Sequence, residues 1–271
     1  MLIGDELIYL ELHKTGCTHT RNILSKIDSL NAKPYGKHNK YHELPKKHRK
    51  NFDDKIKLGN IRNPWDWYVS LWAFGCLKKG GLYNRVTESP NIIPLKKARR
   101  FMKHPYMLYN NPKAWRKVYA DANDSKLFRI WLKLILNDSD VYLGENYKKL
   151  PLSEFTGLLS FRYLNLYTYR NKNAFSKIKS PKQLKSYNEE NNFIDIIIPN
   201  EKIHTKLVDV APIIGASKKA VETVLSSSEQ RTNASKREDY RHYYDEETMN
   251  LVKKKDQLII DKFGYTFETP H

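Results

Sequence analysis

The chain has 271 residues, of which 40% are hydrophobic and 12% aromatic, and its formal net charge is +18 at pH 7. This apolar content excludes an intrinsically disordered chain, and the length allows one substantial core. The charge indicates an anionic partner, such as a nucleic acid, an anionic polysaccharide, a membrane surface or a multiply phosphorylated ligand. The only two cysteines, Cys17 and Cys76, exclude a disulfide framework and favour a reducing compartment.

The N-terminal segment "MLIGDELIYLEL" lacks the basic and apolar regions of a signal peptide. No stretch approaches the roughly eighteen apolar residues that a membrane span requires. We therefore expect a soluble, cytoplasmic protein with no membrane span.

The first part of the chain alternates strands with helices. Glu6–Leu12 and Lys55–Ile61 are short, apolar and rich in residues typical of buried strands. A helix is expected over Thr18–Ser29, and another begins at Pro64, because proline favours the first helical position. This alternation predicts an α/β fold with a central parallel sheet flanked by helices.

The order weakens between Lys78 and Asp124, where glycine, proline and asparagine interrupt any regular period. Helices are expected to resume at Lys126–Leu136 and Leu152–Leu166, followed by a buried strand at Phe193–Ile198. Two further helices are expected, at Ala216–Ser227 and, with Gly264 ending it, at Asp245–Gly264. We predict a single domain over residues 1–271, with an irregular or helical insertion or lid at about 78–124.

The stretch "LHKTGCTHT" places a lysine and a glycine between the first strand and the first helix. The unpaired N–H groups at a helix N-terminus and the helix dipole favour a bound anion, and Lys14 adds a full charge. A Walker A loop requires a lysine directly after its last glycine, whereas Lys14 precedes Gly16. The pattern therefore indicates a phosphate site but disfavours ATP hydrolysis.

A second motif, "IRNPWDWYVSLW", follows the second strand. Arg62 lies at the end of this strand, and Ser70 lies about two helical turns into the next element. Arginine and serine in these positions can hold one phosphate together, in the crevice where open α/β sheets bind ligands. Two phosphate sites in one chain suggest a ligand with phosphates at both ends. The tryptophans of this helix are expected to be core residues.

Together these motifs resemble those of sulfotransferases that use PAPS (3′-phosphoadenosine 5′-phosphosulfate). "LHKTGCTHT" is similar to their 5′-phosphosulfate loop, and "IRNPWDWYVSLW" resembles their 3′-phosphate motif. The C-terminal segment after Asn233 is also similar to the closing segment of bacterial and carbohydrate-type members. The resemblance covers roughly residues 7–75 and 155–268. It implies a P-loop-like three-layer sandwich, PAPS as donor, and no metal.

The resemblance also implies roles for individual residues. Lys14 would contact the bridging oxygen and the 5′-phosphosulfate, and Arg62 with Ser70 would hold the 3′-phosphate. The remaining predicted donor-binding residues are Thr15, Gly16, Cys17, Thr18, His19, Asn233 and Ser235.

Sulfuryl transfer to a hydroxyl group also needs a general base, and histidine is the natural choice near neutral pH. Tyr35–His38 resembles a Tyr-x-x-His stretch of the uronyl 2-O-sulfotransferases, in which the histidine is the base. We therefore predict His38 as the base, with His42 and Glu43 as alternatives.

The expected acceptor is a hydroxyl group of a carbohydrate or glycoconjugate, with anionic polysaccharides included because of the basic segment Lys96–His104. Two other function classes stay open. One is a P-loop-like nucleotide or small-molecule kinase, against which the absent GK[ST] argues. The other is a non-catalytic basic protein that binds nucleic acid, although we expect no nucleic acid partner.

Overall fold

The computed structural model describes residues 1–88, 111–137, 141–169, 173–227 and 237–269. Its centre is a five-stranded sheet with the order β3-β1-β2-β4-β5. The strands are β1 (Leu2–Ile3), β2 (Leu7–Leu10), β3 (Lys33–Pro34), β4 (Ile56–Ile61) and β5 (Ile196–Pro199). The protein therefore has the predicted α/β character.

The sheet is mixed: its core is parallel, as predicted, and its antiparallel edge was not predicted. Strands β2, β4 and β5 are parallel, with Tyr9 opposite Leu58 and Asn60 opposite Ile198. Strand β1 pairs antiparallel with both β2 and β3. The difference arises because β1 and β3 have two residues each, too few to give a strand pattern in the sequence.

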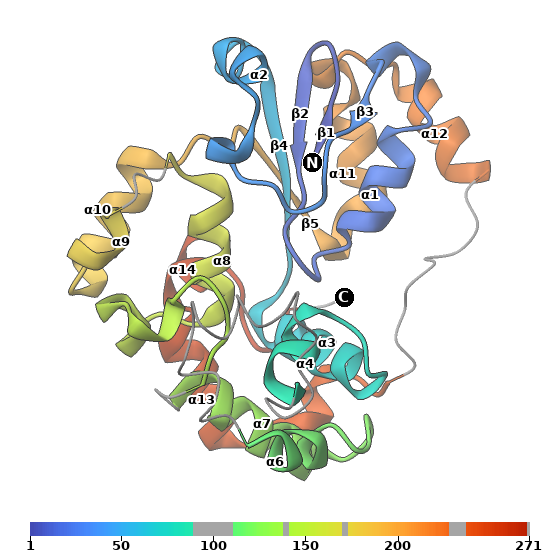
Figure 1. Cartoon of the computed structure of the whole chain (residues 1–271). Coiled ribbons are helices and arrows are strands. Elements are labelled where there is room, and N and C mark those ends of the chain that lie inside the picture. Colours follow the sequence, from blue (N-terminus) through green and yellow to red (C-terminus); the bar gives the residue numbers. More distant parts are fainter. Residues whose placement is uncertain (89–110, 138–140, 170–172, 228–236, 270–271) are drawn as a thin grey trace.

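Helices surround the sheet and extend beyond the carboxyl ends of its parallel strands (Figure 1). The helices before the insertion and within it are α1 (Cys17–Leu24), α2 (Lys46–Lys50), α3 (Pro64–Cys76), α4 (Gly81–Thr87) and α6 (Pro112–Val118). Those after it are α7 (Ser125–Asn137), α8 (Leu158–Tyr167), α9 (Ala174–Lys177), α10 (Pro181–Asn191), α11 (Ile203–Val210), α12 (Lys218–Ser227), α13 (Glu246–Lys255) and α14 (Gln257–Phe263). Residues 89–110 of the predicted insertion, including Lys96–His104, lie outside the described residues.

The side chains of β2 alternate between two apolar clusters. Leu7 and Tyr9 pack with α1, α11 and α12, which lie together beside the sheet. Ile8 and Leu10 belong to the larger cluster, which includes α3, α7 and α8. Both faces of the sheet are covered, so its central strands are buried. Because β2, β4 and β5 are parallel, the loops that follow them leave the sheet at the same edge.

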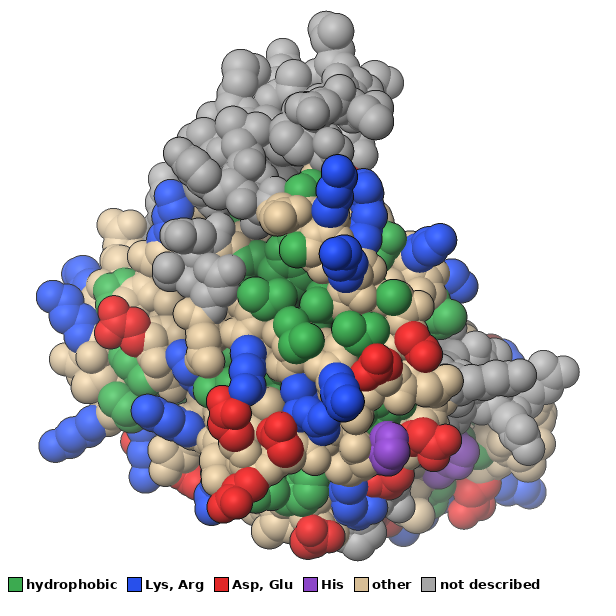
Figure 2. All heavy atoms as spheres, turned by 90° about the horizontal axis from the view of Figure 1, so that it is seen from below, with side chains coloured by type: hydrophobic (Ala, Val, Ile, Leu, Met, Phe, Trp, Pro, Cys, Tyr) green, Lys and Arg blue, Asp and Glu red, His purple; other side chains and the backbone are tan. Residues whose placement is uncertain are grey.

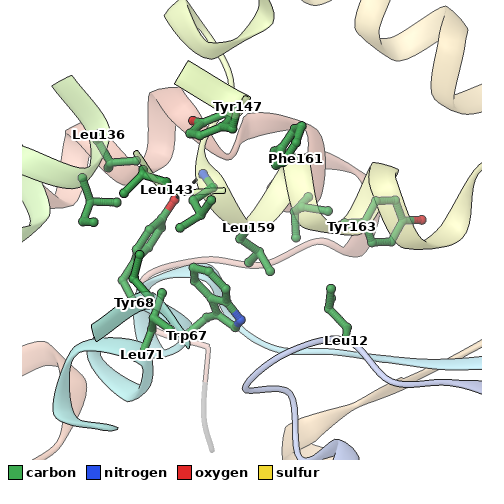
Figure 3. Packing of buried hydrophobic residues seen from close by; sticks show 14 of the residues in the cluster. Leu12, Trp67, Tyr68, Leu71, Leu136, Leu143, Tyr147, Leu159, Phe161 and Tyr163 are labelled. Carbon is green, nitrogen blue, oxygen red and sulfur yellow. Dashed lines mark hydrogen bonds between the residues drawn. The ribbon is translucent and has the colours of Figure 1, made fainter. Parts of the chain in front are cut away.

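The aromatic residues of α3 form the centre of the larger cluster. Trp65, Trp67 and Trp72 are at most 2% exposed, which confirms their predicted structural role. Figure 3 shows Trp67 of α3 beside Leu159 of α8 and the ring of Tyr68 pointing toward Leu143. This packing fixes α3, and with it the polar residues on the side of the helix that faces away from the cluster.

Three predicted helices differ from the observed ones. The helix expected over Thr18–Ser29 ends at Leu24, and a separate 3₁₀ turn follows at Asp28–Leu30. The helix expected over Leu152–Leu166 begins only at Leu158, after a 3₁₀ turn at Pro151–Glu154. The C-terminal helix ends at Gly264 as expected but is interrupted at Asp256. The buried Asp256 carboxylate accepts hydrogen bonds from Tyr68 and Ser160, and these tertiary contacts accompany the break.

Among the described residues, we found no helix with the length and apolar character needed to cross a membrane.

Candidate functional site

A cavity of about 860 Å³ lies where the chain leaves the carboxyl ends of the three parallel strands. The turn after β2 contributes Lys14, the segment between β4 and α3 contributes Arg62, and the segment after β5 contributes Asn200. Ligand pockets are commonly about 300–1,000 Å³, and this edge of an open α/β sheet is their usual place. The cavity is therefore large enough for a nucleotide.

The cavity brings together most of the residues predicted to bind the donor. Those that line it are Lys14, Gly16, Cys17, Thr18, His19, Arg62 and Ser70, together with the predicted base His38. Thr15 does not line the cavity, because its side chain is buried and its hydroxyl donates to the Leu12 carbonyl oxygen at 2.9 Å. Asn233 and Ser235 lie outside the described residues.

The turn between β2 and α1 has two left-handed residues. Lys14 has φ +64° and Gly16, the N-cap of α1, has φ +76°. A Cβ atom on Gly16 would lie 2.5 Å from Ile203 Cδ1 and 2.6 Å from Asn200 Oδ1. Glycine is therefore required both by its backbone angle and by the close approach of the segment that follows β5. This approach brings α1 and the loop after β5 to one side of the cavity.

The Lys14 ammonium group is partly removed from water. Its Nζ lies 4.1 Å from the centroid of the Phe74 ring, a cation–π contact. Burial, and next the nearby Arg62 guanidinium, lower the pKa of Lys14 to about 8. A bound anion would offset both effects, so this lysine is suited to hold a phosphate.

Arg62 belongs to a buried group of charges at the start of α3. Asp66, one helical turn further on, accepts from Arg62 Nε and from Arg237 Nη2, so the two guanidinium groups share one carboxylate. Arg62 Nη1 also donates to the Lys14 carbonyl oxygen at 3.2 Å. Ser70 follows Asp66 by another turn and lines the same cavity. The lysine turn and the arginine–serine pair are thus parts of one site.

His38 has a defined tautomer. Its Nδ1 lies 2.6 Å from the Glu11 carbonyl oxygen, which can only accept, so the proton is on Nδ1. The basic lone pair of the neutral ring is therefore on Nε2. The ring stacks on His13, with centroids 3.5 Å apart and planes 15° apart. Burial lowers the pKa of His38 below its ordinary value of 6.5, which keeps the ring neutral at pH 7.

His13 was not predicted as a site residue, but it lines the cavity beside His38. Burial, followed by the charges of Arg162 and the neighbouring His38, lowers the pKa of His13 well below 6.5. Its backbone carbonyl accepts from Trp67 Nε1 at 2.6 Å, which ties the turn to α3. The two stacked rings are therefore both neutral at physiological pH.

Two of the predicted donor-binding residues on α1 have partners within the protein. The Thr18 hydroxyl accepts from Lys37 Nζ at 3.0 Å, and His19 Nε2 lies 2.8 Å from His204 Nε2. The Cys17 thiol is buried, and burial raises its pKa. Because a buried thiol with a raised pKa is a poor nucleophile, Cys17 is not suited to covalent chemistry.

The alternative bases are placed elsewhere. His42 and Glu43 lie in an exposed 3₁₀ turn at Tyr41–Glu43 and do not line the cavity. The Glu43 carboxylate accepts from the backbone N–H of Lys40 at 2.8 Å, which is a helix-capping contact. Of the three base candidates, His38 alone lines the cavity.

The cavity is strongly basic, and several of its charges were missed in the sequence. The lysines and arginines that line it are Lys14, Lys37, Arg62, Lys79, Arg85, Arg162 and Arg237. Lys37 directly precedes His38, and Arg237 follows the predicted loop at Asn233 and Ser235. Arg162 has a clearer signal, because it is the one charged residue in the apolar helix "LLSFRYLNLY". A charged residue is unusual in such a helix, because charged side chains are rarely buried unless they are paired.

The residues that the structure describes contain no cluster of three or more histidine, cysteine, aspartate or glutamate side chains that could hold a metal ion. Comparisons of the chain with protein-family models, with curated protein sequences and with solved structures found no match. The site is therefore interpreted from its geometry and from the two sequence motifs.

Proposed function

We propose that the protein is a PAPS-dependent sulfotransferase with a P-loop-like fold, which transfers a sulfuryl group to a hydroxyl group of a carbohydrate or glycoconjugate. The observation that carries the proposal is that Lys14, Arg62, Ser70 and His38 line one cavity. A bisphosphate nucleotide needs two cationic sites within one pocket, and a hydroxyl acceptor needs a base beside them.

The residues of the cavity suit the two ends of such a donor. At one end, the N-terminus of α1 and the Lys14 ammonium group favour a phosphosulfate. At the other end, Arg62 and Ser70 favour a phosphate, and Arg237 adds a second guanidinium group. Asp66 holds the two guanidinium groups in fixed orientations, which reduces the ordering cost of binding.

The donor, when bound, supplies an activated sulfuryl group. In the proposed reaction the acceptor oxygen forms a bond to sulfur while the bond from sulfur to the bridging phosphate oxygen breaks. His38 Nε2 accepts the proton of the acceptor hydroxyl, and its Nδ1–H stays bonded to the Glu11 carbonyl oxygen. The Lys14 ammonium group stabilises the charge that develops on the bridging oxygen.

The experiment that tests the proposal uses ³⁵S-labelled PAPS with a panel of glycans, peptides and phenols. We expect label on a glycan with the wild-type protein. Calorimetry with 3′-phosphoadenosine 5′-phosphate (PAP) and with ATP provides a readout that needs no acceptor. Binding of PAP in preference to ATP is the expected result. Binding of ATP without PAP would contradict the proposal and favour a kinase.

A further inference from the structure

Arg162 of α8 lies between two cavities. It lines the 860 Å³ cavity and also a smaller one of about 100 Å³. The two cavities share His13, His38, Arg85 and Arg162. Lys14, Arg62, Ser70 and Arg237 line only the larger one. The smaller cavity therefore adjoins the proposed base and is not lined by the residues proposed to hold the phosphates.

Within the described part of the chain, the guanidinium group of Arg162 forms no ion pair. Its Nη1 is buried without a hydrogen-bond partner among these residues, and the Glu145 carboxylate acts on it only as a nearby charge. Its Cζ lies 5.4 Å from the centroid of the Trp67 ring, so the aromatic face supports the guanidinium group without neutralising it. A buried charge without a partner is costly and is rarely kept unless a ligand completes it.

The nearest charged groups do not supply this partner. Glu145 lines the smaller cavity, but its carboxylate is paired with Lys40 at 2.6 Å and accepts from Asn165. Arg85 adds a second positive charge, and its Nη1 donates to the Leu143 carbonyl oxygen at 2.8 Å. Burial, followed by the charge of Arg85, lowers the pKa of Arg162 to about 10, and the charge of Glu145 opposes this only in part. The region around Arg162 thus has an excess of positive charge.

We propose that Arg162 binds an anionic group of the acceptor, a carboxylate or a sulfate, beside the hydroxyl group that His38 deprotonates. This proposal rests on the proposed function and specifies its substrate class as an anionic saccharide. The smaller cavity has room for such a group but not for a nucleotide. The guanidinium group matches the planar, two-oxygen edge of a carboxylate or sulfate. The nucleotide phosphates have their own cations in the larger cavity.

The test compares matched acceptors on the full-length protein. A uronate-containing tetrasaccharide, its neutral methyl ester and a sulfated tetrasaccharide without uronate are titrated by calorimetry with PAP present. The variants are Arg162→Met, which keeps an unbranched side chain over Trp67, and Arg162→Lys, which keeps a charge. The control is Arg49→Met on α2, because Arg49 does not line either cavity.

Arg162→Met should weaken binding of the charged tetrasaccharides about tenfold to a hundredfold and leave the methyl ester unchanged. Arg162→Lys should give an intermediate loss, and Arg49→Met none. A comparison of the affinities for the uronate-containing and the sulfated tetrasaccharide identifies which anion the site prefers. Equal binding of the acid and its ester by the wild-type protein would overturn the inference, as would an equal loss for both in Arg162→Met.

Titration of the same variants with PAP separates this inference from the proposed function. Arg162→Met should bind PAP as the wild-type protein does. A lower PAP affinity in this variant would place Arg162 in the donor site and overturn the inference. If the wild-type protein failed to bind PAP, the proposed function would fail. In that case, the calorimetric titrations with the charged tetrasaccharides would be carried out without PAP, and they would still test whether Arg162 binds them selectively.

Discussion

At the scale of single residues, the position of His38 depends on its backbone as much as on its ring. Its φ of +61° is in the left-handed region, which residues other than glycine and asparagine rarely adopt. This conformation accompanies the hydrogen bond from Nδ1 to the Glu11 carbonyl oxygen. Strained backbone of this kind is common where a side chain has a functional role.

We expect His38→Asn to lower kcat by about 10²- to 10⁴-fold, which is the usual contribution of a general base. Asparagine tolerates the left-handed backbone, so the loop should keep its shape and the Kd for PAP should stay within about twofold. Turnover with labelled PAPS and calorimetry with PAP measure the two effects. Near-normal turnover of this variant would exclude His38 as the base.

The pH dependence of kcat gives a second check on His38. Because burial lowers its pKa below 6.5, the ring is neutral and able to accept a proton above that pH. The value of kcat should rise with pH to a plateau, with an inflection below pH 6.5, and stay level to about pH 8. If the same inflection persisted in His38→Asn, it would belong to another group.

The affinity for PAP should show the opposite pH dependence, because it depends on the charge of Lys14. With a pKa of about 8 in the free protein, Lys14 loses its charge as the pH rises through that value. The affinity for PAP should therefore fall above pH 8, by at most about tenfold per pH unit. Phosphate groups, with a second pKa of about 6, are already ionised in this range.

Calorimetric titrations between pH 7 and 9.5 measure this effect. Lys14→Arg is the control, because a guanidinium group stays charged throughout the range and should remove the pH dependence. A fall in affinity of equal size in Lys14→Arg would show that Lys14 is not the titrating group.

The two sequence motifs predicted Lys14, Arg62 and Ser70 as site residues, and a weaker local pattern predicted His38. Each of these residues is next to a recognisable strand, turn or helix start. Arg162 and Arg237 could not be found in this way, because they enter the cavity from segments far along the chain. The first motif also predicted Thr15 as a site residue, but its hydroxyl donates to a carbonyl oxygen within the turn and does not reach the cavity.

At the scale of elements, the turn between β2 and α1 depends on Gly16. An alanine there would have to adopt φ +76° and would contact Ile203 and Asn200 at less than 3 Å. We expect Gly16→Ala to destabilise the protein by about 1–3 kcal/mol, which lowers Tm by roughly 5 °C.

The matched control for this variant is Gly81→Ala. A Cβ atom on Gly81, the first residue of α4, would have no atom within 4 Å. Differential scanning calorimetry of the two variants should show a lower Tm for Gly16→Ala and a Tm within about 1 °C of wild type for Gly81→Ala. Similar Tm values for both would mean that the segment after β5 adapts to a side chain at residue 16.

The sequence predicted elements best where the pattern was long and local. Strand β4 and helix α3 start close to their expected residues, because an apolar run and a proline mark them. The edge strands β1 and β3 were missed because they are short and depend on pairing with distant residues. The break at Asp256 is likewise accompanied by contacts to Tyr68 and Ser160, which no local pattern reveals.

At the scale of the whole molecule, the net charge of +18 is compatible with several anionic partners. On the face seen in Figure 2, basic side chains are interspersed with acidic and apolar ones and form no continuous basic surface. The cavity instead gathers basic side chains from the turn between β2 and α1, the segment between β4 and α3, the helices α4 and α8, and the segment that contains Arg237. This concentration favours a small, multiply charged ligand over a nucleic acid duplex.

The measurement that tests this interpretation most directly is the binding of PAP, 5′-AMP and 3′-AMP to the wild-type protein and to Arg62→Met, by calorimetry. If one cavity holds both phosphates, the wild-type protein binds PAP more tightly than either monophosphate. Arg62→Met should then bind PAP no more tightly than 5′-AMP, while its affinity for 5′-AMP is unchanged. Equal binding of all three nucleotides by the wild-type protein, or an equal loss for all three in Arg62→Met, would contradict a shared bisphosphate site.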